Sequence, residues 1–545
     1  MLLSSLRQFL VYRKQLKRLS KELSFRKNCE TAARRIFYLK RCLFTTARNT
    51  QLAPRQLVSA FYKITQQQGI DQVGYQLWLA AQAAAKTMSP VVNHYDEQAY
   101  IGLLGENDQL NPECQVLIAE AFRFHPQVLL IYTDHDELDS AGIRYQPCFK
   151  PAWNPDLFYS INYLGSSVFV RRTWYLSLNL PAELELEAFL WRVLPNLQPQ
   201  QIFHIPRICY HRQQTLVIKQ QPVKENLVLP KLALAALEVE GAELQVGLIA
   251  QSRRWRFPLP KNLPLVSLLI PSKDQLSLLK ACIHSILEKT QYPHYEILII
   301  NNNSQEPETL SWLEYIQQKS NKITVLAYNQ EFNYSAINNF AVSKARGSII
   351  GLINNDIEVI NSEWLTEMVS QACRVEIGCV GAKLYYPDGR IQHAGVILGS
   401  GGGSGHAHRY YPRNDEGYQG RLKLVQNFTA VTGACLVVRK QLYEMVGGLN
   451  ELDLPIAWSD IDLCLKIRQL GYRNLWTPYA ELYHHESVSR GRDKTKAQRR
   501  RYRAETAYMH RTWQSLMYQD PCYNPNLTVI GEGFGLGLPI DSCQD

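Results

Sequence analysis

Between residues 263 and 360 the chain alternates between short apolar runs and longer segments whose apolar residues recur at helical spacing. The apolar runs predict strands at residues 266–270, 296–300, 323–328 and 349–353. The segments between them predict helices at residues 275–288, 310–317 and 335–346. Strands and helices that alternate in this way indicate right-handed β-α-β units around a parallel sheet.

Polar residues follow several of these strands, at the end where open α/β sheets bind their ligands. In chain order they are Pro271, Ser272, Lys273 and Asp274, then Asn301 and Asn302, and finally Asn354, Asn355 and Asp356. Because the carboxyl ends of parallel strands meet at one edge of a sheet, we expect the functional site along that edge.

Length and composition limit the class of protein. A chain of 545 residues exceeds one ordinary core and predicts two domains with extensions. We find no apolar run long enough to span a bilayer, and the first residues are too highly charged for a signal peptide. The twelve cysteines form no CxxC pair, so we expect reduced thiols in a cytoplasmic protein.

The net charge of +10 is concentrated at the N-terminus. Residues 1–48 hold 13 Lys or Arg against 2 Glu, a balance of +11, so the other 497 residues sum to −1. Apolar residues interleave with these charges, which suits a basic amphipathic helix on the anionic inner face of a membrane. A solvated helical arm is the alternative interpretation. We expect no nucleic-acid partner, because no nucleic-acid motif accompanies the charge.

Specific motifs run through the second half of the chain. They read IPSKDQLSLLKACIHSIL, EILIINNNS, FNYSAINNFAVSKARGSIIGLINNDIEVI, VGAKLYYPDGRIQHAGVILG, AVTGACLVVRK, VGGLNELDLPIAWSDIDLCLKIRQLGYRNLWTPYAELYHHESVSRG and DPCYNPNLT. In these motifs, residues 266–528 resemble the C-terminal domain of two-domain bacterial family 2 glycosyltransferases, several of which are described as rhamnosyltransferases or O-antigen transferases. The resemblance implies an α/β, Rossmann-like GT-A fold that transfers sugars from nucleoside diphosphates.

Charge on a nucleoside diphosphate leaving group is usually neutralised by a divalent cation with few protein ligands. Side chains at positions i and i+2 of a strand end point to one side, so Asn354 and Asp356 are placed to share this cation, as the family's DxD motif does. The resemblance adds His484 as a ligand and implies Mg²⁺ or Mn²⁺. The alternatives are an Asx-rich turn and a structural histidine.

The resemblance places the nucleotide-sugar against Pro271, Ser272, Asp274, Asn301, Asn302, Asn338, Asn354, Asn355 and Asp356. Asn301 stands where the family usually has an aspartate that pairs with a uracil or thymine ring, and an asparagine still bonds both an N–H and a carbonyl. Asp274 and Asn338 are equally well interpreted as a helix cap and a surface residue. A dTDP- or UDP-linked sugar is the expected donor.

Inverting transfer needs a base that removes the proton of the acceptor hydroxyl. The resemblance assigns this role to Asp460, with Asp462 as a supporting carboxylate. A capping box between Ser459 and Asp462 is the structural alternative, and both roles are compatible because a helix N-terminus keeps a carboxylate ionised. On the acceptor side we expect Trp458, His393 and Gly433.

Residues 103–212 resemble only the second half of a GT-A domain, through IYTDHDELDSAGIRYQPCFKPAWNPDLFYSINYLGSSVFVRR and FHIPRICYHR. Gly105 and Asn107 replace acidic positions of the family's metal motif, and LELEAFLWRV has no aspartate at the position of the base. We interpret this segment as a degenerate domain kept for packing or acceptor binding. Its carboxylates at residues 132–138 are then structural.

The predicted domains are a basic helical extension (1–90), the degenerate GT-A-like domain (91–250), a linker (251–262), the catalytic GT-A domain (263–485) and a basic helical tail (486–545). The predicted function is inverting transfer of a sugar such as rhamnose to a bacterial cell-surface polysaccharide or lipid-linked glycan. The alternative is an inactive protein that binds glycan or scaffolds a synthesis complex. Retention of Asp356, Asp460 and His484 favours the enzyme.

Overall fold

The computed structural model describes residues 69–86, 99–105, 108–181, 184–213, 241–485, 495–530 and 533–537, together with Ala233 and Leu237. The chain divides into two compact units. Unit 1 is Met1–Val239, Gly399–Gly402 and Tyr518–Asp545, and unit 2 is Glu240–Leu398 and Gly403–Met517. The basic arm predicted at residues 1–48 lies outside the described residues.

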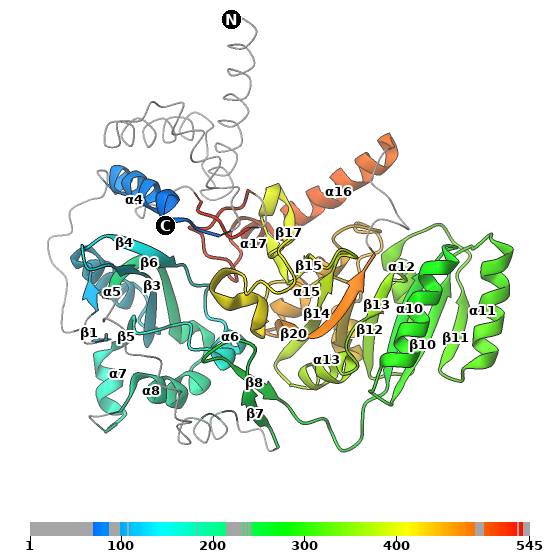
Figure 1. Ribbon diagram of the computed structural model, residues 1–545, viewed down its shortest axis with the longest axis horizontal. Helices are drawn as coiled ribbons and strands as arrows, with labels where there is room; N and C mark the ends of the chain where they lie inside the picture. The colour runs from blue at the N-terminus through cyan, green and yellow to red at the C-terminus, as the bar shows by residue number, and fades with distance from the viewer. Residues whose placement is uncertain are drawn as a thin grey trace, which may run out of the picture. The chain divides into compact units, whose positions relative to one another are not determined.

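Unit 2 is organised around a ten-stranded sheet with the strand order β11-β10-β9-β12-β19-β14-β20-β13. The first half of the sheet is parallel and contains β9 (Val266–Ser272), β10 (Tyr295–Asn301), β11 (Ile323–Ala327) and β12 (Ile349–Ile353). The connecting helices are α10 (Leu276–Lys289), α11 (Pro307–Lys319) and α12 (Tyr334–Lys344), drawn in green in Figure 1. These elements confirm the predicted alternating segment, with ends shifted by a few residues.

The second half of this sheet is mixed. It contains β19 (Cys435–Arg439), β14 (Ile377–Tyr385), β20 (Arg473–His484) and β13 (Ile357–Val359). β19 runs antiparallel to β12 and β14, β20 runs parallel to β14, and β13 runs antiparallel to β20. Two short strands join the rim, β15 (Ile391–His393) on β14 and β18 (Gln426–Asn427) on β20.

Helices and one hairpin complete unit 2. The helices are α13 (Trp364–Ala372), α14 (Lys440–Met445), α15 (Ser459–Gln469) and α16 (Lys496–Thr512). β16 (Val396–Leu398) pairs with β17 (Ser404–His406) in a separate hairpin. A short helix, α17 (Gln514–Tyr518), follows α16 at the boundary between the units.

The core of unit 2 explains the long apolar runs of the sequence. β12 and β14 are buried along their whole lengths, as expected for strands covered on both faces. Their side chains pack in one cluster with Leu268, Trp364 and Leu475. β12 and β9 approach so closely that a Cβ on Gly351 would lie 2.7 Å from Cδ2 of Leu268, which accounts for a glycine inside this strand.

Part of the segment predicted as a linker is a strand. β8 (Arg253–Arg256) pairs with β7 (Glu243–Val246) in an antiparallel hairpin of unit 2. Arg254 forms an ion pair of 2.9 Å with the buried Glu367 of α13, and the Arg254 guanidinium also lies over the ring of Tyr479. Arg254, a basic residue of the predicted linker, therefore attaches this hairpin to the domain.

Unit 1 is built on a six-stranded sheet with the order β1-β5-β3-β6-β2 and with β4 on β3. The strands are β1 (Tyr100–Leu103), β2 (Gln109–Leu110), β3 (Leu130–Leu138), β4 (Arg144–Cys148), β5 (Val168–Arg171) and β6 (Ile202–Gln213). The helices are α4 (Gln72–Lys86), α5 (Pro112–Phe124), α6 (Pro155–Ser160), α7 (Arg172–Ser177) and α8 (Leu186–Val193).

The sheet of unit 1 repeats the second half of the sheet of unit 2. β5 is antiparallel to β1 and β3, β6 is parallel to β3, and β2 is antiparallel to β6. The same order and directions hold for β12, β19, β14, β20 and β13. No counterparts of β9, β10 and β11 occur among the described residues of unit 1. This agrees with the partial GT-A-like domain that the sequence predicts.

The C-terminal segment returns to unit 1 instead of forming a separate helical tail. The side-chain amide of Asn524 donates to Oδ2 of Asp134 and to the carbonyl oxygen of Lys150, both at 2.8 Å. Asn526 donates in the same way to the carbonyl oxygen of Pro206. All of these groups are buried or nearly so, so residues 520–528 are part of the interior of unit 1.

Two predictions from composition concern the whole chain. Within the described ranges, no helix combines the length and apolar character that crossing a bilayer requires. Every cysteine in those ranges has a free thiol, in agreement with the absence of CxxC pairs.

Candidate active site

A cavity of about 620 Å³ lies at the carboxyl ends of β9 and β12. It is lined by Pro271, Ser272, Lys273, Asn302, Phe332, Tyr334, Ile337, Asn354, Asn355, Asp356, Gln392, His406, Thr432, Gly433, Ala434, Ile456, Ser459, Asp460, His484, Gln498 and Arg501. All of these residues belong to unit 2. The polar edge predicted from the strand ends is therefore the floor of a cavity.

Strand pairing places Asp356 beside His484. Asp356 stands directly before β13, and the first residue of β13, Ile357, is paired with His484 at the end of β20. The carbonyl oxygen of Asp356 also accepts the backbone N–H of His485 at 3.0 Å. Because both strands are fixed in the sheet, the two side chains meet at the rim of the cavity.

The side chains of Asp356 and His484 have few hydrogen-bond donors around them. Nε2 of His484 lies 3.3 Å from Oδ1 of Asp356 and 3.3 Å from Nδ2 of Asn354. Nε2 carries either one lone pair, which accepts the Asn354 amide, or one proton, which it donates to the carboxylate, so it cannot satisfy both neighbours at once. Nδ1 of His484 is buried and has no hydrogen-bond partner among the described residues, and for Oδ1 of Asp356 the structure gives only the contact with the His484 ring there. The arrangement therefore suits a positively charged guest.

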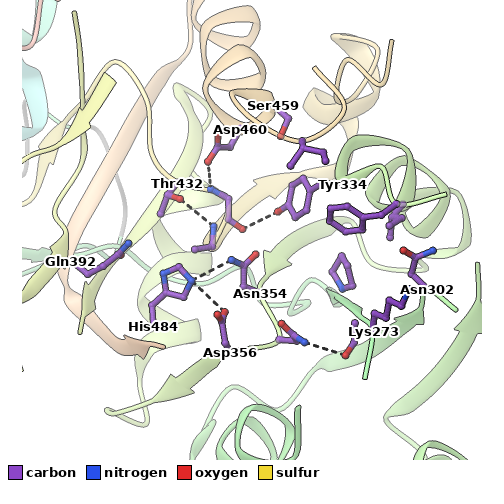
Figure 2. A pocket seen from close by; sticks show the side chains of 18 of the residues that line it. Lys273, Asn302, Tyr334, Asn354, Asp356, Gln392, Thr432, Ser459, Asp460 and His484 are labelled. Carbon is purple, nitrogen blue, oxygen red and sulfur yellow. Dashed lines mark hydrogen bonds and ion pairs between the residues drawn. The ribbon is translucent and has the colours of Figure 1, made fainter. Parts of the chain in front are cut away.

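Asp460 lies on the other side of the cavity, in the first turn of α15 (Figure 2). Oδ2 accepts the N–H of Gly433 at 2.7 Å and Oδ1 accepts the N–H of Ile461 at 2.9 Å. Burial raises the pKa of this carboxyl above its ordinary value. A Cβ on Gly433 would lie 3.0 Å from the hydroxyl of Tyr334 and 3.2 Å from Cβ of Asp460, so a larger residue there would press on both side chains.

A second, smaller cavity of about 190 Å³ shares Asp460, His406 and Thr432 with the first. It is otherwise lined by Val396, Ser404, Ala457, Trp458, Ile461 and Tyr502. Asp460 thus stands at the junction of a large polar cavity and a small, partly aromatic one. Trp458, predicted on the acceptor side, lies in the small cavity, and Gly433 lines the large one.

The opposite end of the large cavity contains Lys273 and Asn302 (Figure 2). The side-chain amide of Asn302 donates to the carbonyl oxygens of Tyr328 and Gln330 at 3.0 and 2.8 Å. Asn355 donates to the hydroxyl of Ser272 at 3.2 Å. These bonds fix the cavity floor between β9 and β12.

Several predicted residues are not among those that line the large cavity. Asn301 accepts the N–H of Ser304 at 3.0 Å, and Asp274 accepts the N–H groups of Gln305 and Glu306 just before α11, at 2.8 and 3.0 Å. Asp274 thus holds the loop before α11 and is the N-cap of neither α10, which is Gln275, nor α11, which is Glu306. Asn338 is fully buried within α12, where its amide donates to the carbonyl oxygen of Tyr334 at 2.8 Å.

Asp462 does not reach the cavity, although it was predicted as the supporting carboxylate. Its Oδ1 accepts the indole N–H of Trp513 at 2.9 Å, and its Oδ2 lies 2.8 Å from Nζ of Lys466. The capping box with Ser459 is not formed either, because α15 starts at Ser459 and its N-cap is Trp458. Asp462 thus faces the opposite side of its helix from the cavity.

His393 is fully buried and supports its neighbour His406. Their Nδ1 atoms lie 2.8 Å apart, so one proton is shared between them. Nε2 of His393 accepts the N–H of Gly395 at 3.3 Å, which assigns that proton to Nδ1 of His393. Burial keeps the pKa of His393 well below its ordinary value. His406, and not His393, therefore lines both cavities.

The sequence did not indicate Arg501 and Gln498 of α16, which line the large cavity. The basic run after His485 was predicted to lie beside the donor site, but through Arg490 and Arg492, which fall outside the described residues. A run of several arginines gives no signal for which one faces a cavity. Only the packing of α16 on the loop before α15 identifies Arg501.

Comparisons with known proteins identify the family that part of unit 2 resembles. Residues 267–447 match the family model described as Glycosyl transferase family 2. This range contains Asp356 and Gly433 and ends before Asp460 and His484.

Curated relatives cover most of the chain. An uncharacterized protein, y4gI, of Sinorhizobium fredii is 43% identical over 453 residues, which are 81% of this chain and 50% of that protein. The O-antigen biosynthesis protein RfbC of Myxococcus xanthus is 35% identical over 446 residues, 80% of this chain and 34% of that protein. The chain thus spans half or less of the length of these two relatives.

A shorter match is to a relative with a named activity. The N-acetylglucosaminyl-diphospho-decaprenol L-rhamnosyltransferase of Mycobacterium tuberculosis is 30% identical over 123 residues, 21% of this chain and 40% of that protein. Among solved structures, GalNAc-T7 with UDP, GalNAc and Mn²⁺ is similar at a TM-score of 0.39 and 16% identity, over 48% of this chain and 51% of that one.

Proposed function

Since the chain contains a family 2 glycosyltransferase domain of the GT-A class, we propose that unit 2 transfers a sugar, with inversion, from a nucleoside diphosphate to a glycan or lipid-linked acceptor. The observation that carries the proposal is the pairing of two carboxylates across one cavity. Asp356 stands beside His484 at one wall, and Asp460 stands at the other, where the small cavity joins.

The donor fits the end of the large cavity between Lys273 and Asp356. Lys273 and Arg501 supply positive charge for a diphosphate, and both line this cavity. Asn302 and Ser272 lie toward the nucleoside end, on the strands that bind nucleotides in open α/β sheets. A dTDP- or UDP-linked sugar is the proposed donor, with rhamnose as the proposed sugar, in keeping with the name of the mycobacterial relative.

The residues fit a divalent cation, Mg²⁺ or Mn²⁺. Asp356 and His484 offer an oxygen and a nitrogen 3.3 Å apart, and Asn354 adds a neutral carbonyl if its amide is turned. No cluster of three or more His, Cys, Asp or Glu was found in the described parts of the chain, so diphosphate oxygens and water complete such a site. The cation would neutralise charge on the leaving group.

Asp460 is the proposed base. The acceptor oxygen bonds to the anomeric carbon from one face while the bond from that carbon to the diphosphate oxygen breaks on the other, and the acceptor proton passes to a carboxylate oxygen of Asp460. The N–H groups of Gly433 and Ile461 hold this carboxylate in place. The raised pKa of Asp460 strengthens it as a base.

The small cavity is the proposed position of the acceptor. It opens beside Asp460, and Trp458 and Tyr502 give it aromatic surface next to the polar side chains of Ser404, His406 and Thr432, a mixture that suits a sugar hydroxyl and ring. In the proposed setting the acceptor is a bacterial cell-surface polysaccharide or a lipid-linked glycan, and the enzyme works in the cytoplasm at the inner face of the membrane. The name of the Myxococcus relative supports this setting.

The test is release of nucleoside diphosphate from UDP-glucose, UDP-N-acetylglucosamine, dTDP-rhamnose and GDP-mannose by the full chain, with Mg²⁺ or Mn²⁺. Asp356→Ala and Asp460→Asn are compared with the wild type and with Asp388→Asn. Asp388 is a half-exposed carboxylate of unit 2 that pairs with Arg390 outside both cavities.

Turnover of one donor that both cavity variants lose and Asp388→Asn keeps supports the proposal and identifies the class of donor. Absence of turnover and of nucleotide binding in the wild type favours the inactive scaffold instead. Turnover that survives in Asp460→Asn would assign the base to another residue.

A further inference from the structure

Helix α16 holds the backbone that leads to Asp460. The side chain of Glu505 is 1% exposed, and its Oε1 accepts two backbone N–H groups, from Ile456 at 2.9 Å and from Ala457 at 3.0 Å. Both donors lie in the loop that enters α15. One carboxylate oxygen therefore fixes two consecutive peptide units shortly before the proposed base.

The loop at this point has a conformation that needs outside support. Trp458 has φ 69° and ψ −5°, in the left-handed region, where a large side chain is strained. Its indole N–H donates to the hydroxyl of Thr506, one residue beyond Glu505, at 3.3 Å. The strained residue lies between the two amides that Glu505 holds and the first turn of α15, so contacts from α16 fix the start of that helix.

The second oxygen of Glu505 connects the loop to the large cavity. Oε2 lies 3.3 Å from Nε of Arg501, whose side chain lines that cavity and is 24% exposed. Glu505 thus lies between the cation that faces the donor and the loop that presents the base. A buried carboxylate costs free energy unless it is paired, and here both of its oxygens have partners.

We propose that Glu505 is a positioning residue for transfer: it fixes the loop at Ile456 and Ala457 so that Asp460 stands at the junction of the two cavities. Glu505 is not among the residues that line either cavity, so it acts through the backbone and through Arg501. This inference rests on the proposed function, because it explains how Asp460, the proposed base, is held in its position.

The first test is amide hydrogen exchange of peptides covering residues 454–460 in the full chain. Glu505→Ala removes the acceptor of two N–H groups, and we expect their exchange to become about tenfold faster. Glu505→Gln keeps a carbonyl oxygen in the same place, so we expect exchange close to the wild-type rate. Met509→Ala, which removes a buried apolar side chain of the same helix, serves as the matched control. Unchanged exchange in Glu505→Ala would overturn the inference.

The second test is kinetic and uses the donor turned over in the panel. We expect Glu505→Ala to lower kcat about 100-fold, the effect of a base displaced by about 1 Å, with KM for the donor within about threefold of wild type. Glu505→Gln should restore most of kcat. Faster exchange with unchanged kcat, or an equal loss of kcat in Met509→Ala, would overturn the positioning role.

Asp460→Asn, measured beside these variants, separates the two proposals. If Asp460→Asn retains activity, the proposed base is wrong, while the exchange data still show whether Glu505 holds the loop. If Asp460→Asn is inactive and Glu505→Ala is fully active, the proposed function stands and the positioning inference fails.

Discussion

Unit 1 and the second half of unit 2 share five strands in the same order and directions. The carboxylates at the corresponding edge of the two sheets, however, have different partners. In unit 2 the residue before the short edge strand is Asp356, whose Oδ1 has the ring of His484, at 3.3 Å, as its contact among the described residues. In unit 1 the residue before the corresponding strand is Asp108, whose Oδ2 accepts the N–H of Gly105 at 3.0 Å and a hydroxyl of Ser166. A buried carboxylate with few hydrogen-bond donors indicates a ligand site, and one whose oxygens have their donors indicates a structural role.

The register extends this comparison to the histidines. Ile357 pairs with His484 in unit 2, and Gln109 pairs with His211 at the same point of the sheet in unit 1. His484 faces the cavity. The ring of His211 is bonded to Asp136, which also receives Nε of Arg144 at 2.5 Å. The same fold position thus holds a histidine beside a carboxylate in both units, but in unit 2 this pair lines the large cavity.

The comparison shows that a sheet does not by itself make a site. In unit 1 the C-terminal segment brings Asn524 to Asp134, which also accepts Nε2 of His204 and the N–H of Lys150, each at 2.9 Å. These donors satisfy the hydrogen-bonding capacity of the Asp134 carboxylate and connect the strands. This contrast predicts that substitutions of carboxylates in unit 2 affect catalysis and that substitutions in unit 1 affect stability.

Asp460→Asn should lower kcat about 1,000-fold, because a general base contributes on the order of 10² to 10⁴. The matched variant is Glu187→Gln in the first turn of α8, the helix of unit 1 that corresponds to α15. We expect Glu187→Gln to leave kcat unchanged. Nucleoside diphosphate release under saturating donor measures both, and an equal loss in both variants would show that the comparison of the units is wrong.

Asp356→Ala should lower metal-dependent turnover about 100- to 1,000-fold, since a cation at the leaving group is worth several kcal/mol. A chelator should abolish wild-type turnover, and added Mn²⁺ should restore it. Asp108→Ala is the control in unit 1, where the lost contacts are to Ser166 and Gly105 only. Full activity of Asp356→Ala, or turnover in excess chelator, would contradict the proposed cation.

Asp134→Ala should destabilise unit 1 by about 3–5 kcal/mol, because it leaves His204, the N–H of Lys150 and Asn524 without their shared acceptor. Denaturant or thermal unfolding of the full chain measures the loss, and kcat per folded molecule should not change. Asp388→Ala removes a half-exposed ion pair of unit 2 and should leave unfolding unchanged. A large loss of kcat in folded Asp134→Ala would assign unit 1 a part in catalysis.

The sequence predicted most of the first half of the unit 2 sheet, because its strands are continuous apolar runs and its helices keep their spacing. Strand-end spacing also predicted that Asn354 and Asp356 lie together, and the resemblance to family 2 glycosyltransferases added His484, whose Nε2 lies 3.3 Å from both side chains. The motifs correctly suggested that residues 103–212 form only part of a GT-A domain, and the strand order confirms this.

The other features of the fold and the site could not be predicted from the sequence, because they depend on long-range packing. Asp460 and Asp462 lie in the same helical turn, and only the position of Trp513 shows that Asp462 points away from the cavity. The contact of Asn524 with Asp134 joins residues 390 positions apart, which no local pattern indicates. Arg501 and Glu505 likewise act through a helix that follows the domain in sequence and returns to it in space.

The pH dependence of turnover should reveal the environment of Asp460. Burial raises its pKa above the ordinary value of 3.8, and the base works only when ionised. The acid limb of kcat/KM should therefore fall tenfold per pH unit below a midpoint that lies above the ordinary value. Circular dichroism at each pH separates this limb from acid unfolding. A midpoint at or below the ordinary value would mean that another group limits the rate.

Asn354→Asp should have the smallest effect of these variants. It tests what Asn354 contributes to the proposed cation site. Asn354 gives the cavity a neutral amide at two positions before Asp356, so a second carboxylate there adds a negative charge beside His484. We expect half-maximal activation at about tenfold lower Mn²⁺ concentration, with kcat within about threefold, because a hard cation prefers a carboxylate to an amide oxygen. Asn361→Asp is the control, since its amide bonds to Tyr479 away from the cavity. If Asn354→Asp weakens Mn²⁺ activation, the amide is needed as a donor to His484, and the cation is held by Asp356 and His484 without it.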